Sequence, residues 1–293
     1  MIFSPSRTST YQTCPMKHHL SRTEGWRPRA LTKRDLAAIV GSAFAEGIAV
    51  WNRERPAMFV SASHTAEAEA ERQIQRLLDA GCIIPTVLLP DVEYAPTVAA
   101  RAVERVCAND PIPADWTIVD VERPFEEHGN ARPDLVCRDD TGALVIVDYK
   151  CAMALKDGYV AERLDGYRRS AQMHHYVWAA RTVYGESVDA EPWTVRYAAT
   201  VDRYAIVLVR IEPWKVWLQP YTVDERMLRR WTDSAWATWD RMGTPTIEGP
   251  ASHWDACVTK FGPCEFMAAC FDHGLDEAMM ALDYVRVPRE EAV

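Results

Sequence analysis

The feature that most limits the possible folds is a pair of short β-forming segments with acidic residues at matching ends. Asp134 lies at the start of the segment 133–138. Asp148 lies at the end of the apolar segment 143–149, and Lys150 directly follows that segment. A hairpin between these segments brings both carboxylates to one end of a sheet. Residues two apart on a strand share a face, so we expect Asp134, Asp148 and Lys150 to meet.

This group has the chemistry that phosphodiester hydrolysis needs. A hard cation must neutralise the phosphate and lower the pKa of an attacking water. Mg²⁺ and Mn²⁺ prefer carboxylate and carbonyl oxygens, which Asp134, Asp148 and the main-chain carbonyl of Tyr149 can supply. Lys150 would then orient the water and offset charge on the phosphate. The alternative is a surface hairpin with an ordinary Asp–Lys ion pair.

The rest of the chain predicts an α/β fold: a mixed sheet flanked by helices, with an N-terminal helical elaboration. We treat 1–293 as one domain with three parts, namely 1–112, the core 113–222, and 223–293. The expected helices are 5–20, 33–53, 64–81, 94–109, 159–183 and 223–242. The expected strands are 116–123, 133–138, 143–149, 193–200 and 204–211, with a shorter apolar piece at 215–219.

Charge and hydropathy exclude several classes of protein. The net charge of −9 argues against a protein that coats nucleic acid by bulk attraction, although a local basic strip remains compatible with DNA binding. No run of eighteen apolar residues predicts a membrane span, and the first fifteen residues lack the apolar core of a signal peptide. We therefore expect a cytoplasmic protein with no membrane partner. No GxxxxGK[ST] motif occurs, so any DNA unwinding would need another protein.

Four of the eight cysteines form a pattern of their own. Cys257, Cys264 and Cys270 fall within fourteen residues, and Cys14 precedes Pro15 near the start of the chain. Four thiolates suit a [4Fe–4S] cluster or a zinc ion. Structural zinc sites commonly use C-x-x-C pairs, which are lacking, and the long spacings favour the bulkier cluster. Unligated cysteines are the remaining alternative.

On these motifs the chain resembles the PD-(D/E)xK superfamily in its RecB-like branch, which includes CRISPR-associated iron–sulfur exonucleases, AddAB-type recombination nucleases and phage exonucleases. The resemblance covers most of the chain. It implies a restriction-endonuclease-like core with Asp134, Asp148 and Lys150 as catalytic residues. Iron–sulfur members have one cysteine before a proline at the start and three near the end, which implies a C-terminal clasp that joins Cys14 to the later cysteines.

Two further motifs fit this resemblance. Gln172 and Tyr176 match a Q-x-x-x-Y that shapes the site and contacts DNA in the RecB-like branch, and a spacing of four puts both on one helical face. Glu122 ends the strand before Asp134, where similar nucleases place a glutamate near the metal. A solvated helix face and an exposed strand-end glutamate are the structural alternatives.

One departure concerns the early G-x-x-x-H motif of these nucleases, whose histidine is an extra metal ligand. Here Gly41 is followed by Ala45 at the histidine position and then by Glu46. The metal would have fewer protein ligands, Glu46 would substitute, or activity would be reduced. The neighbours His174 and His175 we interpret as one packed and one solvated side chain.

These observations together lead us to expect an exonuclease that uses Mg²⁺ or Mn²⁺ at DNA ends in recombination, repair or phage replication. A helicase or recombinase is the expected protein partner. The alternatives are a catalytically reduced DNA-binding scaffold on the same fold and a structure-specific endonuclease.

Overall fold

The expected three-stranded meander is the first half of the central sheet. In the computed structural model, β2 (Thr117–Val121), β3 (Leu135–Arg138) and β4 (Leu144–Ala154) pair as antiparallel neighbours. Leu135 lies opposite Val147 and Arg138 opposite Leu144, so the turn between the two strands holds five residues, 139–143. Gly142 closes this turn at φ +84°, a conformation that glycine adopts without a steric penalty.

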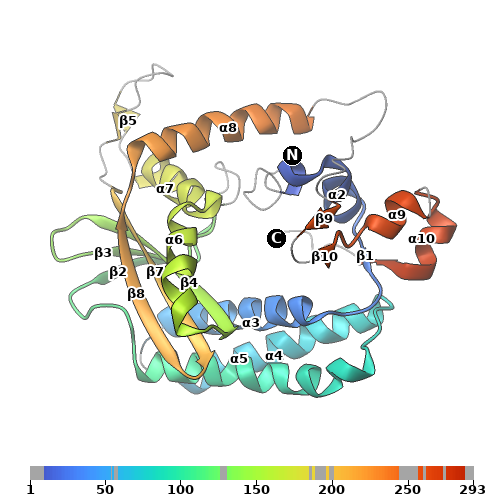
Figure 1. Cartoon of the computed structure of the whole chain (residues 1–293). Coiled ribbons are helices and arrows are strands. Elements are labelled where there is room, and N and C mark those ends of the chain that lie inside the picture. Colours follow the sequence, from blue (N-terminus) through green and yellow to red (C-terminus); the bar gives the residue numbers. More distant parts are fainter. Residues whose placement is uncertain are drawn as a thin grey trace.

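Two more strands complete a five-stranded mixed sheet in the order β2-β3-β4-β7-β8. β7 (Arg203–Glu212) runs parallel to β4, and β8 (Lys215–Thr222) returns antiparallel at the edge. Parallel neighbours need a crossover, which the helices between β4 and β7 supply. The sheet and its flanking helices confirm the predicted α/β class (Figure 1).

The structure describes residues 10–53, 55, 59–125, 131–184, 187–188, 196–197, 201–243, 257–259, 262–272 and 275–287. Among the helices of these segments, none combines the length and the apolar character that crossing a membrane requires.

Each face of the sheet has its own apolar core, because strand residues alternate between the faces. Val147 and Tyr149 pack with α3 (Lys33–Arg53), α4 (Phe59–Asp79) and α5 (Leu89–Ala108), which follows the short turn η2 (Thr86–Leu88). Ile146 and Leu208 pack on the other face with α6 (Val160–Arg168), α7 (Ala171–Tyr184) and α8 (Glu225–Gly243). Asp148 alternates with Val147 and Tyr149 and therefore faces the second group of helices.

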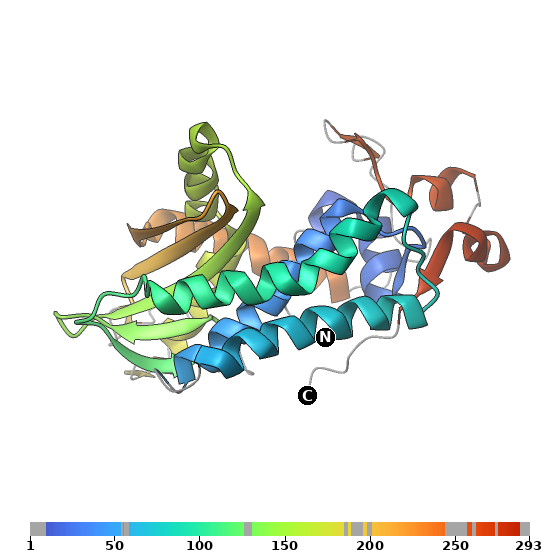
Figure 2. The same ribbon diagram turned by 90° about the horizontal axis from the view of Figure 1, so that it is seen from below.

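Close packing of the first helical layer depends on one glycine. A Cβ atom at Gly47 would lie 2.7 Å from the Ala62 carbonyl oxygen and 2.7 Å from a Val103 methyl group. No side chain fits at that spacing, so α3, α4 and α5 approach one another where α3 has no side chain. This layer (blue to green in Figures 1 and 2) forms the N-terminal helical elaboration that the sequence predicts.

Three predicted elements differ in the structure. The single helix expected over 159–183 is two helices, because Ser170 Oγ accepts a hydrogen bond from the Gln172 amide and starts α7. Residues 5–9 of the helix expected over 5–20 lie outside the described residues. The rest is interrupted at Cys14, whose backbone is extended before Pro15 begins α2 (Pro15–His18). The π-helical turn η1 (His19–Thr23) follows α2.

The strand expected over 193–200 does not join the main sheet where it can be followed. Its described part, β6 (Arg196–Tyr197), pairs with β5 (Ser187–Val188) in a separate antiparallel ribbon. The rest of that range lies outside the described residues.

Segments near the two ends of the chain meet in a small module whose short strands the sequence pattern does not predict. β1 (Trp26–Pro28) pairs antiparallel with β11 (Tyr284–Arg286), and α2 lies beside the C-terminal elements in Figure 1. The remaining elements are β9 (Val258–Thr259) paired with β10 (Gly262–Pro263), α9 (Met267–Phe271) and α10 (Glu277–Asp283). The module has its own apolar core of Leu20, Trp26, Phe266, Ala269, Met280 and Tyr284.

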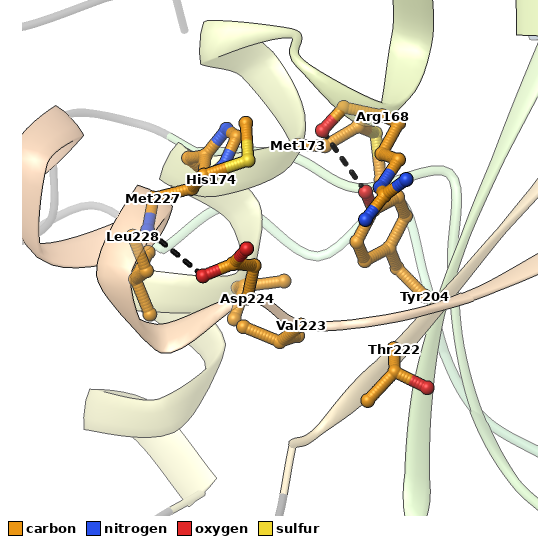
Figure 3. A pocket seen from close by; sticks show the side chains of 10 residues that line it. Arg168, Met173, His174, Tyr204, Thr222, Val223, Asp224, Met227 and Leu228 are labelled. Carbon is orange, nitrogen blue, oxygen red and sulfur yellow. Dashed lines mark hydrogen bonds between the residues drawn. The ribbon is translucent and has the colours of Figure 1, made fainter. Parts of the chain in front are cut away.

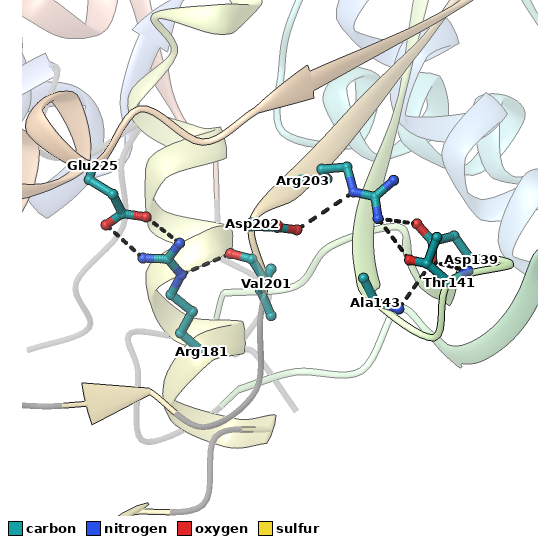
Figure 4. A network of polar contacts seen from close by, with 8 residues as sticks. All are labelled: Asp139, Thr141, Ala143, Arg181, Val201, Asp202, Arg203 and Glu225. Carbon is teal, nitrogen blue, oxygen red and sulfur yellow. Dashed lines mark hydrogen bonds and ion pairs between the residues drawn. The ribbon is translucent and has the colours of Figure 1, made fainter.

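A polar network fastens the start of β7 to the β3–β4 turn (Figure 4). Asp139 Oδ1 accepts hydrogen bonds from Thr141 and from the Ala143 amide, and its Oδ2 lies 2.5 Å from Arg203 Nη2. Burial alone would raise the pKa of Asp139, but these hydrogen bonds and the Arg203 charge hold it below the usual value. The network fixes the turn that sets the register of β4 against β7.

Candidate active site

The three residues of the acidic motif do meet, on the face of the sheet that α6 and α7 cover. Asp134 Oδ2 accepts a 2.6 Å hydrogen bond from the Tyr149 amide, so Asp134 is held next to β4. Asp148 is fully buried, and its Oδ2 lies 2.6 Å from Lys150 Nζ. The register of β3 and β4 thus produces the expected cluster.

Burial makes the charged forms of Asp134 and Asp148 unfavourable. It raises the pKa of Asp134 to about 8, with a further contribution from the charge of Asp148. Burial also raises the pKa of Asp148, which the nearby Lys150 ammonium opposes. Apart from the contact between its Oδ2 and Lys150, Asp148 has no hydrogen-bond donor among the residues that the structure describes, and its Oδ1 has none at all among them. An unsatisfied buried carboxylate is costly, and a divalent cation would relieve it, so this residue set fits such an ion.

Lys150 remains the positive partner of the cluster. Burial would lower its pKa, but Asp148 and Asp134 reverse that effect and raise the pKa above the usual value. The half-buried Tyr167 in α6 also contributes to the raised pKa of Lys150. The Tyr167 hydroxyl accepts a hydrogen bond from Arg163 Nε at 3.1 Å. Lys150 is therefore protonated at neutral pH.

Glu122 belongs to the same cluster. Its amide donates a 3.1 Å hydrogen bond to the Asp134 carbonyl, and its side chain is only 7% exposed. Burial raises the pKa of Glu122, the nearby Arg132 lowers it, and Glu46 raises it again. The backbone of Glu122 has φ +47°, which costs a non-glycine residue energy and is common at functional sites.

Arg132 is a site residue that the sequence analysis did not single out. Its Nε lies 3.4 Å from Glu122 Oε2, and its side chain is more than half exposed. The available signal was its position directly before Pro133-Asp134, although arginine at an exposed position is ordinarily a solvated residue. Arg132 therefore brings a positive charge to the solvent side of the carboxylates.

Gln172 and Tyr176 lie on one face of α7, as the spacing of four predicts. Gln172 Nε2 donates a 2.8 Å hydrogen bond to the Tyr176 hydroxyl. Burial raises the pKa of Tyr176 above its usual value, and the charges of Asp148 and Asp134 raise it further. Tyr176 is therefore close enough to Asp148 and Asp134 for their charges to affect its pKa.

The side chains of two other candidates point elsewhere. The Tyr149 ring contacts Phe44 of α3 edge-on, with 6.4 Å between ring centroids, so only its main chain faces the carboxylates. His175 is buried and His174 half-buried, and both contact Trp231 of α8, His174 by stacking and His175 at a tilted angle. One histidine is packed as expected, while the other is covered more than a solvated residue would be.

The four patterned cysteines line one pocket in the module of the chain ends. Cys14 lies at the start of α2, and Cys257, Cys264 and Cys270 surround it from the C-terminal segment. Burial raises the pKa of Cys270 to about 11, and the neighbouring cysteines add to this shift. The pKa of Cys257 is raised by the same causes. Within the described ranges, no three His, Cys, Asp or Glu side chains are already grouped tightly enough to hold a metal ion.

Comparison with known proteins places this geometry in a family. The sequence profile of the PD-(D/E)XK nuclease superfamily matches residues 2–271, which is most of the chain. The protein therefore belongs to the PD-(D/E)XK nuclease superfamily. No curated protein matches the chain.

Proposed function

We propose that this protein is a metal-dependent DNA nuclease that removes nucleotides from DNA ends, with Asp134, Asp148 and Lys150 as its catalytic residues. The observation that carries the proposal is the fully buried Asp148 carboxylate. It lies beside Asp134, its Oδ2 pairs with Lys150, and its Oδ1 accepts no hydrogen bond from the described residues. An arrangement that costs folding energy is expected where a substrate or cation completes it.

A Mg²⁺ or Mn²⁺ ion would be held by Asp134, Asp148 and the main-chain carbonyl of Tyr149. Glu122 is the next candidate ligand because it is buried against Asp134, and Glu46 follows because it acts on Glu122. Such an ion supplies Lewis-acid stabilisation of the phosphate and a lowered pKa for bound water.

The remaining residues position the reactants. Lys150 is protonated, so it can donate a hydrogen bond to the attacking water or to the phosphate and offset the charge that develops there. The Gln172–Tyr176 hydrogen bond fixes a polar edge of α7 against the carboxylates, where it can orient a DNA strand. Arg132 adds a cation at the exposed side of the site.

The cysteine pocket is proposed to hold a [4Fe–4S] cluster bound by Cys14, Cys257, Cys264 and Cys270. Support comes from the shared pocket, in which the cysteines lie close enough to affect one another's pKa values. A bound cluster would stabilise the thiolate forms that burial disfavours. The cluster would clasp the two chain ends as a structural element. Protein purified without oxygen should be brown with about four irons per chain, whereas colourless protein that contains zinc would assign the pocket to zinc.

Cleavage of labelled DNA with Mn²⁺ tests the proposed activity. Wild type should shorten linear DNA from its ends and leave a closed circle intact, whereas Asp148→Ala should cleave neither substrate. Cleavage of the circle would indicate a structure-specific endonuclease instead. Cleavage that survives Asp148→Ala would reject the site. Addition of a helicase or recombinase then tests for the expected partner.

A catalytically reduced scaffold is the second candidate function, favoured by Ala45 at the position where similar nucleases have a ligating histidine. It predicts DNA binding without cleavage by the wild type. Ala45→His should then raise metal affinity and restore cleavage.

A further inference from the structure

A second surface on the same face of the sheet has the features of a nucleic-acid groove. An open depression of about 500 Å³ lies between α6 and the edge strand β8. Trp217 and Tyr221 from β8 and Val160 and Leu164 from α6 line it with apolar surface. None of these residues belongs to the proposed catalytic group.

The aromatic side chains of this groove are held in place. The Tyr221 hydroxyl donates a 2.8 Å hydrogen bond to the Leu164 carbonyl, and its ring stacks on Tyr204 with centroids 5.1 Å apart. The Trp217 ring has the Arg210 guanidinium 5.3 Å from its centroid. Fixed aromatic rings lose little entropy when a planar group stacks on them.

The free charge of the groove is positive although the whole chain carries −9. Its two carboxylates are neutralised, because Asp157 pairs with Arg210 at 2.7 Å and Asp165 pairs with Arg169. No carboxylate among the described residues forms an ion pair with the lining residues Lys215 and Arg168. Lys215 Nζ lies 5.1 Å from the centroid of the Trp217 ring. Because neither Lys215 nor Arg168 is neutralised by a carboxylate of the described residues, both can attract a negatively charged ligand.

The two cations lie at opposite ends of the groove. Arg168 is near the Tyr221 end, because its carbonyl accepts a 3.1 Å hydrogen bond from Tyr204, which pairs with Tyr221 (Figure 3). Lys215 begins β8, six residues before Tyr221. At about 3.3 Å per strand residue, the groove is roughly 20 Å long, which is enough for several nucleotides.

The sheet register links the groove to the catalytic residues. Lys150 lies opposite Leu208 in β7, and Leu208 lies opposite Trp217 in β8. Directly opposed residues share a face, so Lys150 and Trp217 are on one face, two strands and roughly 10 Å of backbone apart. Two neighbouring residues at the end of α6 also connect the two regions: Tyr167 affects the pKa of Lys150, and Arg168 lines the groove.

We propose that this groove binds a segment of single-stranded DNA, with bases stacked on Trp217 and Tyr221 and phosphates held by Lys215 and Arg168. Aromatic rings between cations are the usual means of binding a single strand without regard to sequence. The choice of DNA rests on the proposed function. The groove would hold the strand close to the catalytic carboxylates.

Fluorescence anisotropy measures the affinity for a labelled oligothymidylate of twelve nucleotides and so tests the proposal. A chelator is present so that cleavage cannot interfere. Trp217→Leu and Lys215→Glu should each weaken binding about tenfold, and Trp217→Phe should restore part of it. Lys215→Glu should also flatten the salt dependence of binding. Lys33→Glu is the matched control, because Lys33 lies in α3 with 79% of its side chain exposed.

Binding that is equal in wild type, Trp217→Leu and Lys215→Glu would overturn the groove, whatever the cleavage assay shows. An equal loss in Lys33→Glu would also overturn it, because the effect would then come from net charge alone. Conversely, cleavage that survives Asp148→Ala would reject the catalytic site and leave the groove standing if the binding losses are seen.

Discussion

The carboxylate cluster and the cysteine pocket differ in how the chain builds them. Asp134 directly precedes β3 and Asp148 lies in β4, two adjacent strands joined by a five-residue turn, and the sheet fixes both. The cysteine pocket joins Cys14 to residues more than two hundred positions later, through short elements and a small apolar core.

This difference indicates which of the two sites has its geometry fixed by the fold before a ligand binds. The carboxylates are held by sheet hydrogen bonds even though burial makes them unfavourable, so the fold stabilises the site. The cysteine pocket lies among strands of two or three residues, and a bound group would stabilise the elements around it. We expect substitutions in the first site to affect chemistry and substitutions in the second to affect stability.

The largest effect should come from Asp148→Asn. The substitution keeps the shape of the side chain but removes the charge that a divalent cation needs, so cleavage should fall by about a thousandfold or more. A nuclease assay with Mn²⁺ measures the loss. Circular dichroism should remain unchanged. A variant that unfolds would instead show that the carboxylate supports the sheet and would weaken the contrast between the sites.

Cys264→Ser should chiefly lower stability. Loss of a bridging group that closes so long a loop should cost roughly 3 to 5 kcal/mol of unfolding free energy. Thermal melting and iron content together measure the effect. Cys82→Ser is a control, because Cys82 is buried away from the pocket and its loss should leave the iron content unchanged. Wild-type stability in Cys264→Ser would show that the pocket holds nothing structural.

Metal affinity should depend on pH through Asp134. Its pKa is raised to about 8 in the metal-free protein, so below that pH a proton competes with the cation. Affinity should rise up to about tenfold per pH unit between pH 6 and 8 and level off above. Calorimetric titration with Mn²⁺ measures this slope, which Asp134→Asn should abolish along with most binding. A flat profile in the wild type would contradict the electrostatic description of the site.

Asp139→Asn should have a moderate effect on stability, since it weakens hydrogen bonds to a charged acceptor by about 1 to 2 kcal/mol. The folded pKa of Asp139 is lowered, so its contribution is present above the unfolded pKa of about 4. It is lost as the pH falls through the folded pKa. Urea denaturation at pH 7 and pH 3 should therefore show a difference between wild type and variant that shrinks at the lower pH.

Glu46→Ala should have the smallest effect, a reduction of a few fold in metal affinity. The charge of Glu46 raises the pKa of Glu122 but is not among the causes of the raised pKa of Asp134. A metal titration that matches the wild type would remove Glu46 from the candidate ligands and leave Glu122 unaffected.

Local sequence signals predict the β3–β4 hairpin, which carries the proposed catalytic residues. The apolar run before Asp148 and the turn at 139–142 fix both the strands and their register, and Q-x-x-x-Y places Gln172 and Tyr176 correctly. The prediction of one helix over 159–183 is wrong because periodicity does not reveal that Ser170 caps a new helix.

Long-range pairing is harder to predict. β1 and β11 are three residues each, too short for a periodic pattern, and they pair across almost the whole chain. Likewise, the parallel pairing of β4 with β7 depends on how α6 and α7 pack, which strand patterns do not encode. Arg132 enters the site through contact with Glu122, for which its neighbours in sequence give only a weak indication.

The pairing of β1 with β11 has a consequence for synthesis on the ribosome. β1 leaves the exit tunnel early but has no partner until residues 284–286 emerge, and Cys14 must wait for Cys264 and Cys270 over nearly the same interval. The central sheet can assemble meanwhile. A nascent chain that stalls before its end would thus have its carboxylates in place while its thiols remain exposed to oxidation.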